Sequence, residues 1–259
     1  MPEERSGDFI QSLERGLTVI NSFSRERASQ TLSEVAHLTG LTRATVRRIL
    51  LTLAELGYVD HNGRSFSLTP KVLDLGYSFL SSFHILEFAQ PPMERLVEEV
   101  NESSSMSVLD LPDIIYVARV PTTRIMTISL ALGSRLPAYP TSMGRVLLSG
   151  LPDAEIDQYI KKTKLEQLTK YTVTDRKEFR SVLMKTRGQG YALVDQELEV
   201  GVRSLAAPIR NARGDVMAAM NISCHATRAS VGRMREELLP RLLDTAAEVS
   251  GRAGALQVG

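Results

Sequence analysis

Residues 31–68 predict two short helices followed by a hairpin, and few folds share that order. The stretch opens with TLSE, which has the spacing of a capping box: Thr31 accepts a hydrogen bond from the Glu34 amide, and the Glu34 side chain reaches back. The first helix is expected to end at Gly40. A second helix is expected to begin after Thr42 and to end at Gly57, because glycine readily adopts the left-handed conformation of a helix end. This order is typical of a helix-turn-helix.

The second of these helices has an apolar face and a basic face. Apolar residues recur at helical spacing on one side: Val46, Ile49, Leu50, Leu53 and Leu56. Arg43 and Arg47 lie four residues apart on the other side, and Arg48 lies near the border. Recognition helices enter the major groove of DNA by their N-terminal end, so we expect Arg43 and Arg47 near the bases and Arg48 near phosphate.

An Asn-Gly pair at residues 62–63 follows, and it is typical of a tight β-hairpin with a type I′ turn. In that register Val59 faces Phe66, and Arg64 extends as part of a wing toward the DNA backbone or the minor groove. Two other interpretations remain: the arginines form an ordinary solvated face, or the winged helix binds protein. The residues predicted to contact DNA are Thr31, Thr42, Arg43, Ala44, Thr45, Arg47, Arg48, Asn62 and Arg64.

The charge of the chain is concentrated locally. Residues 40–72 hold five Lys or Arg against two acidic residues, although the net charge of all 259 residues is only +1. This pattern favours a specific contact with nucleic acid over general basicity. No stretch approaches the roughly 18 apolar residues of a membrane span, and the N-terminus lacks the apolar segment of a secretory signal. With one cysteine, Cys224, an internal disulfide is excluded, and we expect a cytoplasmic protein.

Further helices are predicted on both sides of the helix-turn-helix. A helix over residues 9–23 is expected to turn Phe9, Leu13, Leu17 and Ile20 inward, and Thr69-Pro70 opens another. Serines at 81–82 and prolines at 91–92 interrupt this pattern. We therefore expect a DNA-binding domain at 1–82, a linker at 83–92 and a second domain at 93–259.

The second domain alternates strands with helices. Strands are predicted over 105–111, 114–120, 125–130, 191–194, 204–209 and 216–223, and helices over 142–151, 153–160, 175–187 and 230–253. Strands in two groups around helices predict an α+β fold with an antiparallel sheet.

No group of residues in the second domain predicts catalysis or a cofactor. The four histidines, His37, His61, His84 and His225, are scattered and have no partner at the spacing of a zinc site. Cys224 and His225 are adjacent, but burial of Cys224 at a strand end is the simpler interpretation. There is no glycine-rich phosphate loop, and no base is placed near Ser204. We expect a binding domain without enzymatic activity, cofactor or metal.

Several stretches resemble the IclR family of bacterial transcription regulators: FIQSLERGLTVINSF, TLSEVAHLTGLTRATVRRILLTLAELGYV, FSLTPKVLDLGYSFLSS and GVRSLAAPIRNARGDVMAAMNIS. Residues 102–151 more narrowly resemble members that control aromatic-acid breakdown through the β-ketoadipate pathway. The resemblance implies a winged helix, a linker helix and a GAF-like effector-binding and oligomerisation domain. It also implies dimers or tetramers on palindromic or repeated DNA operators, with a small organic acid as effector.

The same resemblance implies where the effector binds. The family's pocket lies between the sheet and the helix that follows YPTSMGR, residues 139–145, and the helix amides there could receive a carboxylate. Many relatives carry a small residue where this chain has Met143, so its bulk is expected to narrow the pocket. The predicted effector-binding residues are Met106, Arg119, Met126, Ser142, Met143, Gly144, Arg203, Ser204, Asn221 and Ser223. Arg119 and Arg203 are the expected charge partners of an acid, and Met106 and Met126 the expected apolar wall.

Together these patterns predict a ligand-responsive DNA-binding regulator. Two other classes remain. One is an enzyme or sensor that uses a GAF-like domain for a chromophore, haem or a cyclic nucleotide. The other is an architectural DNA-binding protein with an inert dimerisation domain.

Overall fold

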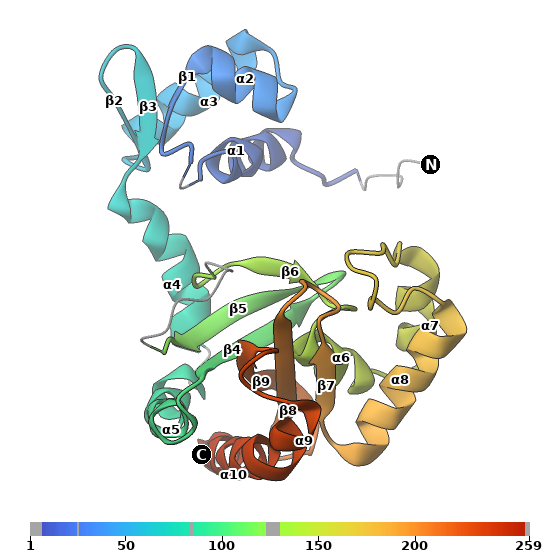
Figure 1. Cartoon of the computed structure of the whole chain (residues 1–259). Coiled ribbons are helices and arrows are strands. Elements are labelled where there is room, and N and C mark those ends of the chain that lie inside the picture. Colours follow the sequence, from blue (N-terminus) through green and yellow to red (C-terminus); the bar gives the residue numbers. More distant parts are fainter. Residues whose placement is uncertain (1–6, 25, 83–84, 123–129, 257–259) are drawn as a thin grey trace. The chain divides into compact units, whose positions relative to one another are not determined.

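The computed structural model describes residues 7–24, 26–82, 85–122 and 130–256 (Figure 1). The chain forms two compact units, residues 1–82 and residues 83–259. None of the helices in these described ranges is both long and apolar enough to cross a membrane.

The N-terminal unit is a winged helix with a three-stranded antiparallel sheet in the order β1-β3-β2. Its elements are α1 (Gln11–Asn21), β1 (Ser29–Thr31), α2 (Leu32–Thr39), α3 (Arg43–Glu55), β2 (Val59–His61), β3 (Ser65–Leu68), a 3₁₀ turn (Pro70–Val72) and α4 (Leu73–Ser82). Its core consists of Val19, Val35, Val46, Leu50, Leu53 and Val59.

Local interactions set the ends of α2 and α3. The capping box is present: the Thr31 amide donates to Glu34 Oε2 over 2.6 Å, and the Glu34 amide donates to Thr31 Oγ1 over 3.4 Å. The Thr31 amide and the Thr31 hydroxyl, which lies 2.8 Å from Glu34 Oε2, both donate to the carboxylate and lower the pKa of Glu34. Gly40 and Gly57 take φ values of 66° and 81°, a left-handed conformation that residues with a Cβ adopt only at a cost. The helix-turn-helix prediction is confirmed in its elements and in its turn.

Three details of this unit differ from the sequence prediction. Phe9, Leu13 and Leu17 are exposed, and α1 instead turns Val19 into the core, with Ile20 packed against it. Leu56, at the end of α3, is also exposed. An unpredicted strand, β1, pairs with β3.

The wing also differs from the predicted hairpin. Val59 pairs with Leu68, and His61 pairs with Phe66, so the register is shifted from the predicted one. Within the loop only Gly63 has a positive φ, which excludes a type I′ turn. The Asn62 side chain organises the loop instead, because its Oδ1 accepts from the amides of Arg64 and Ser65 over 3.1 and 2.9 Å.

The second unit is built on a six-stranded antiparallel sheet in the order β6-β5-β4-β9-β8-β7. Its strands are β4 (Ser103–Asp110), β5 (Asp113–Val120), β6 (Arg135–Pro137), β7 (Ala192–Asp195), β8 (Val202–Arg210) and β9 (Val216–His225). Its helices are α5 (Ile85–Val100), α6 (Ser142–Ser149), α7 (Asp153–Lys162), α8 (Arg176–Gln189), α9 (Val231–Arg233), a π-helical turn (Met234–Leu238) and α10 (Leu239–Leu256). The α+β prediction with an antiparallel sheet is confirmed.

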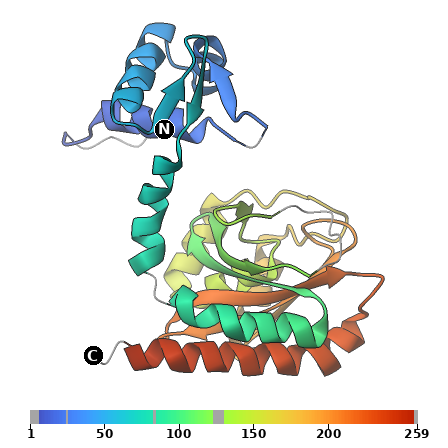
Figure 2. The ribbon, with the colours of Figure 1, turned by 90° about the vertical axis from the view of Figure 1, so that its left-hand side faces the viewer.

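Helices cover both faces of this sheet. Helices α5 and α10 lie side by side against one face (Figure 2), where Leu205, Met220 and Ile222 are buried. Helix α6 lies on the other face, α8 packs on α6 and α7 on α8, and the core there includes Ile114, Leu148, Phe179 and Leu183. Because the sheet is buried on both sides, polar residues that face α6 need partners within the protein.

The segment expected as a linker, 83–92, is not a separate linker in the structure. Its described residues form the first half of α5, which continues through Pro91 and Pro92. Ile85 and Ala89 are buried in the core of the second unit, and this burial holds the helix together despite the missing proline amides. Strand β6 was not predicted, and most of the strand predicted at 125–130 lies outside the described residues.

Gly144 provides a test of the packing at the start of α6. A Cβ at this position would lie 2.0 Å from the Ala138 carbonyl oxygen, so Gly144→Ala must displace the first turn of the helix. We expect it to lower the free energy of unfolding by about 1–3 kcal/mol. At Gly188, in α8, an added Cβ would meet nothing within 4 Å. Gly188→Ala should therefore be neutral or stabilising by about 0.5–1 kcal/mol. Equal urea midpoints for Gly144→Ala and the wild type would contradict this packing.

Candidate functional site

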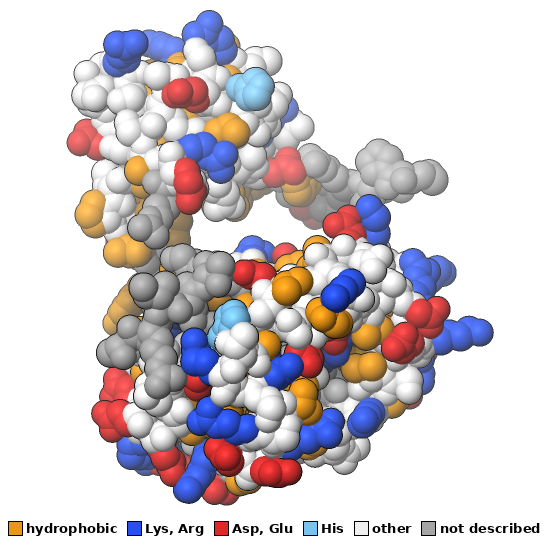
Figure 3. Space-filling model, in the orientation of Figure 1, with side chains coloured by type: hydrophobic (Ala, Val, Ile, Leu, Met, Phe, Trp, Pro, Cys, Tyr) orange, Lys and Arg blue, Asp and Glu red, His pale blue; other side chains and the backbone are white. Residues whose placement is uncertain are grey.

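The first turn of α3 presents its arginines to solvent. Thr42 caps the helix, since its hydroxyl accepts from the Thr45 amide over 3.2 Å. Burial of Val46, Leu50 and Leu53 on the inner face fixes the rotation of the helix. Thr42, Arg43, Ala44, Arg47 and Arg48 are exposed in consequence, while Thr45 is half-buried. Figure 3 shows basic side chains projecting from the surface of the N-terminal unit.

The cations of this surface differ in how they are held. Arg43 donates to the Ser33 hydroxyl of α2, so it spans the two helices of the motif. Within the described ranges, no carboxylate forms an ion pair with Arg47, Arg48 or Arg64. Unpaired surface cations of this kind are available to phosphates and base edges.

Two predicted DNA contacts have side chains that serve local structure. Thr31 is the cap of α2, and Asn62 holds the wing loop. Arg64 is exposed in the loop that Asn62 shapes. Thr31 and Asn62 therefore position the contact surface, and any contact of their own with DNA would compete with these hydrogen bonds.

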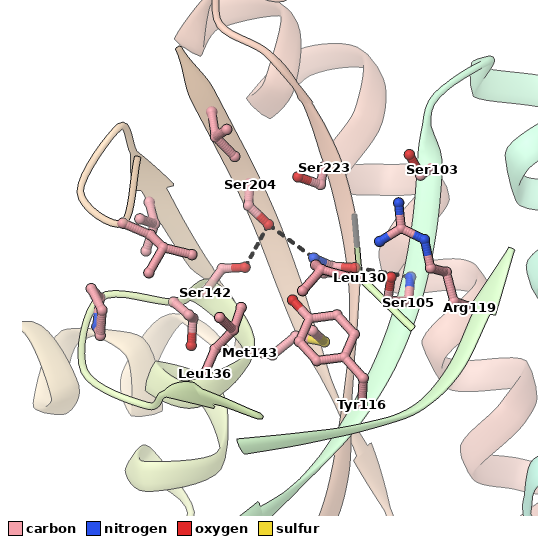
Figure 4. A pocket seen from close by; sticks show the side chains of 16 residues that line it. Ser103, Ser105, Tyr116, Arg119, Leu130, Leu136, Ser142, Met143, Ser204 and Ser223 are labelled. Atoms are coloured by element: carbon pink, nitrogen blue, oxygen red, sulfur yellow. Dashed lines mark hydrogen bonds between the residues drawn. The ribbon is translucent and has the colours of Figure 1, made fainter. Parts of the chain in front are cut away.

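The second unit contains a pocket between the sheet and α6 (Figure 4). Its volume is about 50 Å³, several times the roughly 10–15 Å³ that one water molecule needs on the same measure. Strands β4, β5, β8 and β9 and the first turn of α6 all contribute to it. The lining residues are Ser103, Ser105, Tyr116, Arg119, Leu130, Leu136, Pro140, Thr141, Ser142, Met143, Val194, Leu198, Val202, Ser204, Asn221 and Ser223.

A hydrogen-bonded cluster forms one side of the pocket. The hydroxyls of Ser142 and Ser204 are 2.7 Å apart, and Asn221 Nδ2 donates to Ser204 Oγ over 3.1 Å. Asn221 Oδ1 accepts from the Ser105 amide over 2.9 Å. The cluster joins α6 to three strands and offers neutral donors and acceptors to a ligand.

Arg119 lies across the pocket from Ser142, beside Ser103 and Ser105 (Figure 4). It is half-buried, and it is the one charged residue among those found to line the pocket. Among the described residues no carboxylate pairs with it. Burial raises the pKa of Tyr116 to about 12, although the Arg119 charge opposes the rise, so the phenol stays protonated at neutral pH.

Arg119 and Tyr116 face the same pocket because β5 contains a bulge. Met106 pairs with Ala118 and Ser107 pairs with Tyr116, which leaves Val117 as an extra residue. Without it, residues 116 and 119 would lie on opposite faces of the sheet.

Six of the predicted effector residues line the pocket: Arg119, Ser142, Met143, Ser204, Asn221 and Ser223. Met143 is almost fully buried and accepts a hydrogen bond at its sulfur from Ser107 over 3.3 Å, so its bulk does occupy part of this region.

Three others lie elsewhere. Met106 belongs to the core under α5 and α10, because it alternates with Ser105 along β4. Arg203 alternates with Ser204 in the same way and forms an ion pair with Asp195 over 2.8 Å. Gly144 packs against the Ala138 backbone. Met126 lies outside the described residues.

Sequence reasoning missed Ser103, Ser105, Tyr116 and Leu198 as lining residues. The serines carried a signal, since residues 103 and 105 share a face of any strand that spans them. The sequence does not place Tyr116 in the pocket, because its side of the sheet depends on the bulge. It does not place Leu198 there either, because the path of the loop is needed.

The side chains around the pocket suit hydrogen bonding to a ligand. Among the described residues that line it, Arg119 is the one charged side chain, and the other polar groups are hydroxyls and one amide, which donate and accept hydrogen bonds. In the ranges that the structure describes, no three His, Cys, Asp or Glu residues are grouped to hold a metal ion. A winged helix with arginines that have no carboxylate partner among the described residues, followed by a unit with an internal pocket, is the arrangement expected of a transcription regulator.

Comparison with known proteins identifies the family. Residues 12–63 match the IclR helix-turn-helix domain, and residues 77–251 match the bacterial transcriptional regulator IclR C-terminal domain. The chain belongs to the IclR family and is a transcriptional regulator of that type.

Several relatives are similar over nearly the whole chain. The Pca regulon regulatory protein of Pseudomonas putida is 42% identical over 91% of this chain and 81% of its own. The p-hydroxybenzoate hydroxylase transcriptional activator of Acinetobacter baylyi is 37% identical over 95% and 93%.

Solved structures agree with the fold. A putative transcriptional regulator from Rhodococcus sp. RHA1 has a TM-score of 0.85 at 51% identity, covering 97% of this chain and 100% of its own. An IclR homolog from Microbacterium hydrocarbonoxydans, complexed with 4-hydroxybenzoate, has a TM-score of 0.83 at 22% identity, covering 93% and 98%.

Substitutions in the N-terminal unit should separate base contacts from phosphate contacts. Arg43→Ala and Arg47→Ala should each weaken binding to a DNA duplex selected from a random pool by about 1–3 kcal/mol and relax its base preference. Arg64→Ala should weaken all duplexes alike and make the salt dependence shallower by about one unit. Fluorescence anisotropy measures both effects. Arg213→Ala, at an exposed turn of the other unit, is the control. Wild-type affinity in all three variants would contradict the assignment.

Proposed function

We propose that the pocket of the second unit binds a small aromatic carboxylic acid, and that binding changes the affinity of the regulator for its operator. The observation that carries this proposal is Arg119, a half-buried guanidinium without a carboxylate partner among the described residues, facing a cavity. A guanidinium in such a place binds a carboxylate with charge-assisted hydrogen bonds.

The remaining lining favours a ring with a polar substituent. Tyr116, Leu136 and Val194 offer apolar surface to a ring. The Ser142 and Ser204 hydroxyls lie across the pocket from Arg119, and together with the Asn221 amide they offer hydrogen bonds to a hydroxyl group. The relatives support the same ligand class, since one activates p-hydroxybenzoate hydroxylase by name and another was solved with 4-hydroxybenzoate.

The pocket residues Ser103, Ser105, Arg119, Ser142, Met143, Ser204, Asn221 and Ser223 form the proposed effector site. Residues Thr42, Arg43, Ala44, Thr45, Arg47, Arg48 and Arg64 form the proposed DNA contact, supported by Thr31 and Asn62. A coupling free energy of about 1–3 kcal/mol between the two sites would give a 5- to 150-fold change in operator affinity. We propose no enzymatic activity, and as a reader of chromosomal DNA the protein would act in the cytoplasm.

We further propose that the regulator works as a homo-oligomer on a repeated operator. Two groups of exposed apolar side chains in the N-terminal unit could contact a second copy of the chain. Leu13 and Leu17 of α1 are 60% and 47% exposed, and Leu73 and Tyr77 of α4 are 72% and 69% exposed. Apolar side chains gathered on neighbouring turns of a helix commonly mark a protein interface.

Replacement of Arg119 tests the effector site. Arg119→Met keeps much of the apolar stem and removes the charge, so 4-hydroxybenzoate should bind about 1.5–3 kcal/mol more weakly than to the wild type. Isothermal titration calorimetry measures the affinity. Arg213→Met removes a cation that is 83% exposed and should leave it unchanged.

Two results would count against the proposal. Equal affinity of Arg119→Met and the wild type would remove Arg119 from the site. If no aromatic acid in a panel raised the melting temperature of the wild type, an architectural DNA-binding protein with an inert second unit would be favoured instead.

A further inference from the structure

One wall of the pocket is a short loop between β7 and β8, residues 196–201, which we name the strap. Leu198 of the strap lines the pocket. Gln196 and Gly201, at its two ends, have φ values of 62° and 88°, and the Gln196 amide donates to the Val202 carbonyl over 2.8 Å. This hydrogen bond closes the two ends of the strap, and other contacts hold its middle residues.

A buried ion pair holds the middle of the strap. Arg145 Nη2 lies 2.6 Å from Glu197 Oε2, and the two side chains are only 4% and 9% exposed. Arg145 Nε also donates to the Tyr139 carbonyl over 3.0 Å, and Glu197 Oε2 accepts from the Val173 amide over 3.0 Å. Both charged groups are therefore fixed by further hydrogen bonds.

The pair joins three parts of the chain that are distant in sequence. Arg145 belongs to α6, whose first turn places Ser142 and Met143 in the pocket. Glu197 precedes Leu198 on the strap, and its carbonyl accepts from the Thr172 hydroxyl over 2.6 Å. The Arg145 guanidinium lies 5.8 Å from the ring centroid of Phe179 in α8.

Stability alone is a weak reason for such a pair. Burial removes both charges from water, and well-packed apolar residues of similar size often serve stability as well or better. An apolar pair, however, would not fix the distance and direction between the strap and α6. Neither Arg145 nor Glu197 lines the pocket, yet each belongs to an element that does.

We propose that Arg145 and Glu197 are positioning residues for effector recognition. Their ion pair sets the strap against the first turn of α6, so that Leu198 and Ser142 face one cavity of fixed width. This inference rests on the proposed function, because it concerns the same pocket and the same class of acid.

The test replaces the pair without leaving a buried charge. In Arg145→Met/Glu197→Gln, the amide oxygen at 197 can still accept from the Val173 amide. If the pair positions the pocket, this variant should bind 4-hydroxybenzoate about tenfold more weakly, measured by calorimetry well below its melting temperature. A purely structural role would change the melting temperature and leave the affinity of the folded protein unchanged, which would overturn the proposal.

A matched control is the exposed ion pair between Asp157 and Arg180, whose N···O distance is 2.8 Å. Asp157→Asn/Arg180→Met removes an Arg–carboxylate pair from α7 and α8 and should leave the dissociation constant at the wild-type value. An equal loss of affinity in this control would show a general effect of ion-pair removal and would also overturn the proposal.

Single substitutions on the strap give the answer if the double variant does not fold. Leu198→Ala should weaken binding by about fivefold, because a wall side chain is lost. Val200, on the same strap, is 63% exposed, and Val200→Ala should have no effect. If the two variants bind 4-hydroxybenzoate with equal affinity, Leu198 does not contact the ligand and the strap does not form part of the site. The proposal then fails.

Hydrogen exchange separates this proposal from the proposed function. Without any ligand, the amides of residues 142–145 and 196–201 should exchange about tenfold faster in Arg145→Met/Glu197→Gln than in the wild type, while β4 and β9 remain protected. Unchanged exchange in both segments would overturn the positioning role. If the wild type bound no acid but the exchange changed as expected, the proposed function would fail and the positioning role would stand.

Discussion

The ligand chemistry proposed for the second unit depends on the charge of Arg119, which has no carboxylate partner among the described residues. Arg119 lies half-buried on a sheet that is covered on both faces, where an isolated cation loses part of its hydration. The side chains across the pocket are neutral, so they can orient a ligand but cannot balance the charge. The carboxylate of the proposed ligand would supply that balance. The β5 bulge at Val117 makes this arrangement possible, because it turns Arg119 and Tyr116 to the same side of the sheet.

In the N-terminal unit, the position of the arginines depends on the rotation of one helix, α3. Val46, Leu50 and Leu53 fix one side of α3 in the core, and this leaves the arginines of its first turns on the outside. The hydrogen bond from Arg43 to Ser33 restricts the guanidinium, which would reduce the entropy lost in the proposed contact with DNA. Fixed geometry thus has the same part in both proposals: a held guanidinium would contact DNA, and a held strap and helix turn would contact the acid.

The sequence was most informative where structure depends on neighbouring residues. The capping box at Thr31, the glycines at 40 and 57 and the alternating strands of the second unit were found because each signal lies within a few residues. The wing register, strand β1 and the Val117 bulge depend on how separate segments of the chain pair with one another. Local sequence patterns do not encode this pairing. Ser142, Ser204 and Asn221 came from resemblance to a family. Met106 and Arg203 were misplaced although alternation along their strands, relative to Ser105 and Ser204, points them to the other face.

The most direct test of this account is a crystal structure of the protein grown with 4-hydroxybenzoate. We expect the acid between the sheet and α6, with its carboxylate about 3 Å from the Arg119 guanidinium and its hydroxyl group toward Ser142 and Ser204. An acid bound elsewhere, such as the surface cavity lined by Pro112, Tyr159 and Lys162, or one whose carboxylate faces away from Arg119, would contradict it.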